Sequence, residues 1–181
     1  LTAIYAVIIN ASSSTNLWTT YYRGIFVFPT SGLPDNATVT AATLSLYGYE
    51  KLDTLSAAPD INIYTSTPAS NTALVAADYS QIQAVAQSTA ITFAGFNAAG
   101  WNDFVLNDMT KISKSDVSKF GTRNANYDVA GTSPSWASDT LSYMQVYTSD
   151  KGAGYKPKLV VTYTQTSPST YWPDANPETT S

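Results

Sequence analysis

Short segments in which apolar and polar residues alternate, separated by turn residues, run through most of the chain. In segment 39–49, Leu44 and Leu46 fall on one face, and Thr43, Ser45 and Tyr47 fall on the other. This alternation is typical of a strand with one face on a core. Segment 24–28 is a continuous run of apolar and aromatic residues, which indicates a strand buried in a sheet. The connection 30–36 is rich in Gly, Pro, Asp and Asn, so it predicts a turn between two strands.

The same criteria predict further strands at 1–9, 61–64, 89–93, 101–106, 117–123, 141–148 and 157–163. In segment 101–106, Asn102, Phe104 and Leu106 are expected on the face opposite to the residues between them. Segment 71–85 repeats apolar residues at spacings near three and four, so we expect a short helix there. Other stretches are expected to be a capped helical turn at 107–112 and loops at 50–60 and 124–139.

About nine short strands with turns between them predict an all-β fold. We expect an antiparallel β-sandwich, jelly-roll-like, with one or two short helices. Residues 1–164 would form this domain. Residues 165–181 are proline-rich and lack alternation, which predicts an extended linker or assembly arm carrying the aromatic pair Tyr171 and Trp172. Because the chain begins at Leu1, we expect a processed product or a piece of a longer protein.

Composition and charge restrict the chemistry and the partners. The chain has no cysteine and no histidine, which excludes disulfides, thiolate or imidazole metal sites, and imidazole acid–base catalysis. Its formal net charge is −4 and its only arginines are Arg23 and Arg123, so we expect no nucleic-acid partner. No apolar run approaches the roughly 20 residues of a membrane span, so no membrane insertion is expected.

Carboxylates are the catalytic groups that remain. Only Glu50 and Glu178 are glutamates, both in predicted loops, and no spacing indicates the facing pair that glycoside hydrolysis requires. Asp103, in a predicted strand, is the best single candidate, weighed against an ordinary surface carboxylate. We therefore expect no enzyme activity and no cofactor, with one structural calcium in a loop as an alternative.

Three segments together resemble a known family: 23–49, 100–108 (GWNDFVLND) and 155–163 (YKPKLVVTY). They are similar to the DNRLRE-type modules, carbohydrate-binding-like β-sandwiches of secreted and cell-surface proteins and of phage structural proteins. The resemblance covers roughly residues 21–163 and rests on strand and turn patterns. It implies a non-catalytic module and an additional first strand, for which only 1–9 is available here. If 1–9 does not take that place, one sheet edge is open.

Two functions therefore remain as hypotheses. The first is a structural building block of an extracellular filament, surface layer or virion, which assembles with copies of itself or neighbouring modules through strand edges and the tail. Its candidate assembly residues are Ile4, Tyr5, Val7, Tyr171 and Trp172. The second is a carbohydrate-binding or adhesion module of a larger secreted protein, with Trp136 and Trp18 as rings on which a sugar could stack. Both hypotheses place the chain outside the cell, at a cell surface or in a virion.

Overall fold

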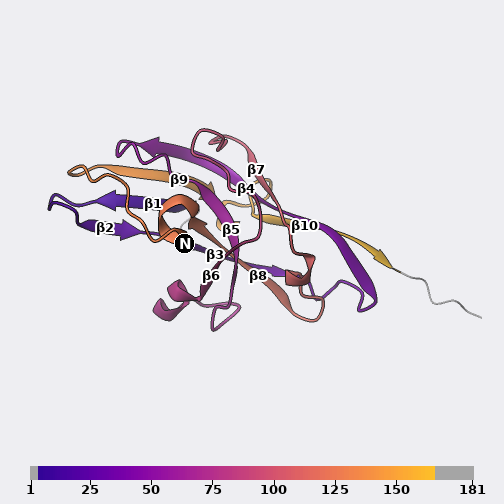
Figure 1. Cartoon of the computed structure of the whole chain (residues 1–181). Coiled ribbons are helices and arrows are strands. Elements are labelled where there is room, and N and C mark those ends of the chain that lie inside the picture. The colour runs from indigo at the N-terminus through magenta and orange to yellow at the C-terminus, as the bar shows by residue number, and fades with distance from the viewer. Residues whose placement is uncertain (1–3, 166–181) are drawn as a thin grey trace, which may run out of the picture.

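The computed structural model describes residues 4–165, which form ten strands and four short helical turns (Figure 1). The strands are β1 Ile4–Ala11, β2 Trp18–Tyr21, β3 Gly24–Pro29, β4 Ala37–Asp53, β5 Ile61–Ser66, β6 Ile82–Ala86, β7 Trp101–Val105, β8 Val117–Asn124, β9 Leu141–Tyr147 and β10 Lys158–Gln165. The helical turns are η1 Ala76–Gln81, η2 Met109–Lys111, η3 Ala125–Val129 and η4 Ser149–Lys151.

The strands form two antiparallel sheets, so the predicted all-β sandwich is confirmed. One sheet has six strands in the order β10-β4-β9-β1-β2, with β7 also paired to β4. The other has four strands in the order β3-β8-β5-β6. The chain passes repeatedly from one sheet to the other, as in jelly-roll-like sandwiches. The turn at 30–36 is one of these crossings, because β3 and β4 belong to different sheets.

Strand β4 is the longest element, with 17 residues, and it organises the six-stranded sheet. Its first part pairs with β10 and β7, and its last part pairs with β9. A register shift between Gly48 and Glu50 marks a β-bulge where these parts meet. The loop predicted at 50–60 is therefore shorter than expected and covers only 54–60, because the bulge interrupts the alternation of side chains while the pairing continues to Asp53.

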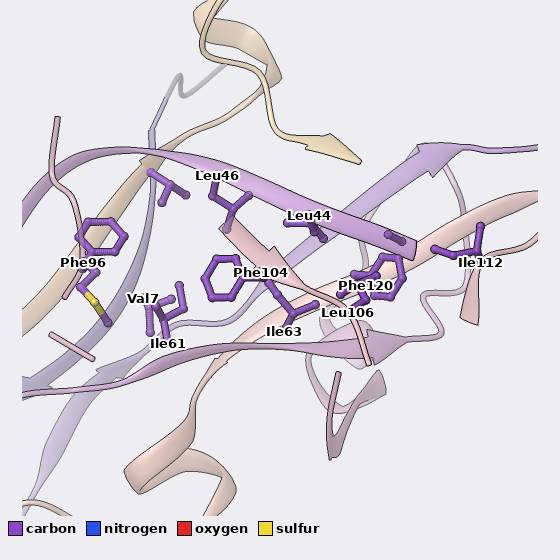
Figure 2. Close-up of a cluster of buried hydrophobic side chains, with 13 residues drawn as sticks. Val7, Leu44, Leu46, Ile61, Ile63, Phe96, Phe104, Leu106, Ile112 and Phe120 are labelled. Atoms are coloured by element: carbon purple, nitrogen blue, oxygen red, sulfur yellow. The ribbon is translucent and has the colours of Figure 1, made fainter. Parts of the chain in front are cut away.

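The main core fills the space between the sheets (Figure 2). Leu44 and Leu46 of β4 and Phe104 of β7 come from one sheet, and Ile63 of β5 and Phe120 of β8 come from the other. Each of these side chains is at most 1% exposed. Burial of each is worth about 1.5–3 kcal/mol, so this alternation is the main sequence signal that specifies the sandwich. The predicted faces of 101–106 are also confirmed.

Two local predictions hold only in part in the region before β7. The helix predicted over 71–85 is limited to residues 76–81, which form η1, because residues 82–86 instead form β6, which pairs with β5. The carboxylate of Asp78 accepts the backbone N–H groups of Ala69 and Val75 at 2.8 and 2.9 Å, which holds the chain in a compact turn. The predicted strand at 89–93 is reduced to a single bridge between Ile91 and Ile61.

The other boundaries agree with the sequence to within a few residues. The predicted helical turn is η2, and the carboxylate of Asp108 caps it by accepting the N–H of Thr110 at 3.0 Å. Within residues 4–165, no helix has the length and apolar character needed to cross a membrane.

Candidate functional site

One lateral side of the sandwich is open between β3 and β10, which are the end strands of their sheets. In the described part of the chain, β3 pairs with β8 and no second strand covers its outer edge. A hollow of about 450 Å³ runs along the whole of β3 from Arg23 to Pro29. A second hollow of about 220 Å³ also touches Pro29 and reaches Leu159 and Val161 of β10. We call β3, these two hollows and residues 157–161 the open side.

Along most of its length, the edge of β3 lacks the features that normally protect an exposed strand. Its sequence, GIFVFP, contains no charged residue, and proline stands only at the last position. Phe26 and Phe28 pack against the core, so Ile25 and Val27 face the other side of the strand, and all four side chains are partly exposed. Natural proteins usually protect such edges with lysines, prolines or bulges, because an unprotected apolar edge can accept another strand.

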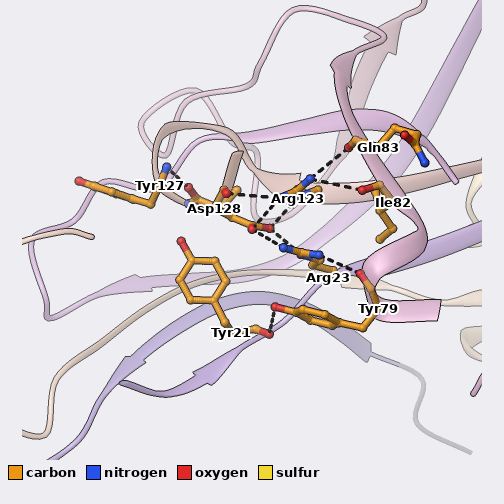
Figure 3. A network of polar contacts seen from close by, with 9 residues as sticks. Tyr21, Arg23, Tyr79, Ile82, Gln83, Arg123, Tyr127 and Asp128 are labelled. Carbon is orange, nitrogen blue, oxygen red and sulfur yellow. Dashed lines mark hydrogen bonds and ion pairs between the residues drawn. The ribbon is translucent and has the colours of Figure 1, made fainter. Parts of the chain in front are cut away.

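Arg23, which begins the hollow along β3, is held by a network of charged groups (Figure 3). Its Nε and Nη2 donate to Asp128 at 2.8 and 2.5 Å, and its Nη1 donates to the carbonyl of Tyr79 at 2.8 Å. Arg123 donates to the same carboxylate at 2.9 and 2.8 Å. The side chains of Arg23, Arg123 and Asp128 are only 14%, 11% and 6% exposed.

The pKa of Asp128 reports this arrangement. Burial of the carboxyl group acts to raise its pKa, but the hydrogen bonds and charges of the two arginines outweigh burial, so the pKa lies below its ordinary value. Each nitrogen of Arg23 already has an acceptor. The network therefore ties the start of β3 to β8, η1 and η3 as a fixed end of the open side.

Another part of the wall of the hollow is formed by Thr148, Ser149 and Pro157, from the connection between β9 and β10. Five aromatic residues fasten this connection to the six-stranded sheet, and we call them the aromatic cluster: Tyr47, Tyr49, Trp101, Tyr147 and Tyr155.

The rings of the aromatic cluster pack mainly edge to face. The ring centroid of Tyr155, in the connection, lies 4.9 Å from that of Tyr47 and 5.1 Å from that of Tyr147. The ammonium group of Lys158 lies 3.9 Å from the ring centroid of Trp101, and that of Lys151 lies 4.9 Å from the ring centroid of Tyr147. The cluster thus fixes a wall of the open side, and it also exposes Tyr49 and Tyr155 by 44% and 37%.

The two tryptophans predicted to stack on sugars are not part of the aromatic cluster. Trp18 and Trp136 both pack against a second, small core that contains Ile9 and Leu55. Within the described chain, the indole N–H of Trp136 is buried and has no hydrogen-bond partner. Both rings therefore have a packing role in this small core, and their sugar-stacking role remains a prediction.

Of the residues predicted to mediate assembly, Tyr5 lies at the open side, where it lines the larger hollow. Ile4, Tyr5 and Val7 belong to β1, which pairs with β9 of its own chain, and Val7 is buried in the core. Pairing of β1 with β2 begins only at Ile9, so residues 4–7 pair on one side, and their assembly role remains a prediction. Tyr171 and Trp172 lie outside the described residues.

Asp103, the best carboxylate candidate, is exposed on β7 opposite Ser45 of β4. Among residues 4–165, no group of three or more acidic side chains is placed to hold a metal ion. Asp53, at the end of β4, accepts the backbone N–H groups of Ala57 and Ala58, each at 2.9 Å, and the structural calcium remains a prediction.

Sequence reasoning missed the open side because an apolar run such as 24–28 looks the same in a central strand and in an edge strand. It also missed the aromatic cluster, although the alternation had placed Tyr47 on the outer face of its strand. Searches of known protein families, curated protein sequences and solved structures found no match for this chain. The resemblance to DNRLRE-type modules therefore remains a prediction.

Proposed function

We propose that this protein is a non-catalytic building block of an extracellular filament, surface layer or virion, and that it assembles by accepting an extended segment along the open side. The unprotected edge of β3 carries the proposal. A sheet edge offers a row of backbone donors and acceptors, and the hollows beside it accept side chains of the added segment, which is the usual form of strand addition.

The surroundings of β3 support a preformed acceptor. The Arg23–Asp128–Arg123 network fixes one end of the strand, and the aromatic cluster fixes another part of the wall of the hollow. An acceptor that is already ordered loses little conformational entropy on binding. The sequence contains no histidine and no cysteine, and residues 4–165 contain no cluster of three or more acidic side chains, which agrees with a non-catalytic role.

Light scattering coupled to size-exclusion chromatography tests the proposal, with negative-stain microscopy of the same fractions. The full chain should form regular oligomers or filaments as its concentration rises. Val27→Lys places a charge on the exposed edge and should leave a folded monomer. Val85→Lys is the matched control, because Val85 is 72% exposed on β6, at the other end of the same sheet, and this variant should assemble normally. A full chain that stays monomeric, or a Val27→Lys variant that still assembles, would refute the proposal.

A second candidate function is glycan binding, favoured by the aromatic cluster. The partly exposed rings of Tyr49 and Tyr155, in a cluster that Lys151 and Lys158 also contact, combine apolar faces with polar groups that suit a sugar ring and its hydroxyls. A glycan array should then give signals that disappear with Tyr155→Ala and persist with Trp136→Ala. An array without signals would remove this alternative for the sugars it carries.

A further inference from the structure

We infer that the open side is filled by residues 166–181 of a second copy of this chain, with residues 169–172 as the added strand. This inference rests on the proposed function and names the partner of that same site. Four observations support it: the direction of β10, the sequence of residues 166–181, the size of the hollow, and the opposite charges of residues 166–181 and residues 150–158.

The direction of β10 favours a second copy over the same chain. Pro157, just before β10, lines the larger hollow, and β10 then runs away from it to Gln165, opposite Ala37. Eight residues of strand cover about 26 Å. The end of β10 lies at one extremity of the molecule, far from the β3 label (Figure 1), and its last four residues are exposed. The sixteen residues after Gln165 therefore begin at the end of β10 that is farther from the larger hollow.

The sequence of the segment matches a short added strand. Ser169, Thr170, Tyr171 and Trp172 stand between Pro168 and Pro173. Proline lacks the backbone N–H that a ladder needs, so the two prolines limit pairing to about these four residues. Strand β3 offers six residues, so a four-residue strand fits along it.

The hollow is large enough for aromatic side chains from the added strand. Its volume of about 450 Å³ lies within the range of roughly 300–1,000 Å³ that is typical of ligand sites. Adjacent side chains of a strand point to opposite faces, so one of Tyr171 and Trp172 would enter the hollow while the other would cover the outer face of β3. Each would bury about 150–250 Å².

The charges of the two partners are complementary. Residues 166–181 contain Asp174 and Glu178 and no basic residue, a formal charge of −2. Residues 150–158, beside the hollow, contain three lysines and one aspartate, a formal charge of +2, in a chain whose net charge is −4. Opposite charges at the rim of an interface steer association and select the partner.

Cysteine cross-linking between two full-length chains tests the inference cleanly, since the chain has no cysteine of its own. Chains with Val27→Cys and chains with Tyr171→Cys are mixed and oxidised, and disulfide-linked species are separated by non-reducing electrophoresis. We expect a mixed dimer linking position 27 to position 171. The matched control mixes Val85→Cys with Tyr171→Cys and should give at least tenfold less mixed dimer, because β6 is the opposite edge of the same sheet.

Three outcomes would overturn the inference. One is equal cross-linking to positions 27 and 85. Another is a chain carrying both Val27→Cys and Tyr171→Cys that forms an intramolecular disulfide and stays monomeric at every concentration. This result would place the segment along β3 of its own chain. The third is unchanged assembly of a chain that ends at Gln165, which would leave the proposed function intact and require a different occupant. A full-length chain that never assembles would instead remove the proposed function itself.

Discussion

The Arg23–Asp128–Arg123 network leads to a quantitative prediction about the substitution Asp128→Asn. The carboxylate accepts four charge-assisted hydrogen bonds, two from each arginine, at 2.5 to 2.9 Å. The asparagine keeps one acceptor oxygen and turns an N–H₂ group toward the remaining N–H donors, so about two of these hydrogen bonds are lost at about 1.5–3 kcal/mol each. Both guanidinium groups would also lose their counter-charge.

Partial exposure of the arginines lets water recover some of this loss. We therefore expect the free energy of unfolding to fall by about 3–5 kcal/mol, the range for removing one partner of a buried ion pair. With a urea dependence of about 2 kcal/mol per molar, the midpoint of urea denaturation should fall by about 1.5–2.5 M. Asp103→Asn is the control, because Asp103 is exposed, and its effect should stay within about 0.5 kcal/mol. A loss below about 1 kcal/mol for Asp128→Asn would refute the reasoning.

The same carboxylate predicts a dependence on pH. Because its pKa is lower in the folded protein than in the unfolded chain, its stabilising effect is present above the ordinary aspartate pKa of about 3.9 and is lost as pH falls through the lower folded value. The difference in stability between wild type and Asp128→Asn should therefore be constant from pH 7 to pH 5 and should shrink below about pH 4. A difference that stays constant through pH 3 would contradict this assignment.

Two further predictions each compare a pair of substitutions, and urea denaturation measures the change in the free energy of unfolding. Phe104→Ala should lower the free energy of unfolding by about 3–5 kcal/mol, because it opens a cavity in the main core. Val105→Ala, on the solvent side of β7, should change it by less than about 0.5 kcal/mol. Similar losses for the two variants would contradict the assigned faces. Gly48→Ala should destabilise the fold by about 1–3 kcal/mol, because its new Cβ would meet the carbonyl oxygen of Asn97. Gly32→Ala should be nearly neutral, because its Cβ would meet no atom within 4 Å. A neutral Gly48→Ala would contradict this prediction and show that the bulge tolerates a side chain.

The sequence predicted those parts of the fold in which burial alternates regularly. Segments such as 101–106 and 141–148 place every second side chain in the core, so period-2 patterning was sufficient to find β7 and β9. The pattern failed where a tertiary contact overrides it. Asp78 fixes a turn inside a segment with helical spacing, and the bulge at Gly48 shifts the alternation of β4.

The candidate site was harder to predict because it depends on which strands are sheet edges. Strand order is set by pairings between residues far apart in the sequence, such as Phe26 with Phe120, and no local pattern encodes these pairings. The tryptophans were more conspicuous in the sequence than the tyrosines, yet Trp18 and Trp136 pack against a small core. The exposed Tyr49 and Tyr155 each lie against Tyr147 of β9, and Tyr49 is brought there by the pairing of β4 with β9.

Hydrogen–deuterium exchange of β3 at increasing protein concentration tests the central claim most directly. Peptides that cover residues 24–29 should become at least tenfold slower to exchange as the chain assembles, because an added strand would protect the amides of the open edge, while peptides that cover β6 should be unchanged. Exchange at residues 24–29 that is independent of concentration while assemblies form would show that the chains associate through another surface, and it would contradict the account.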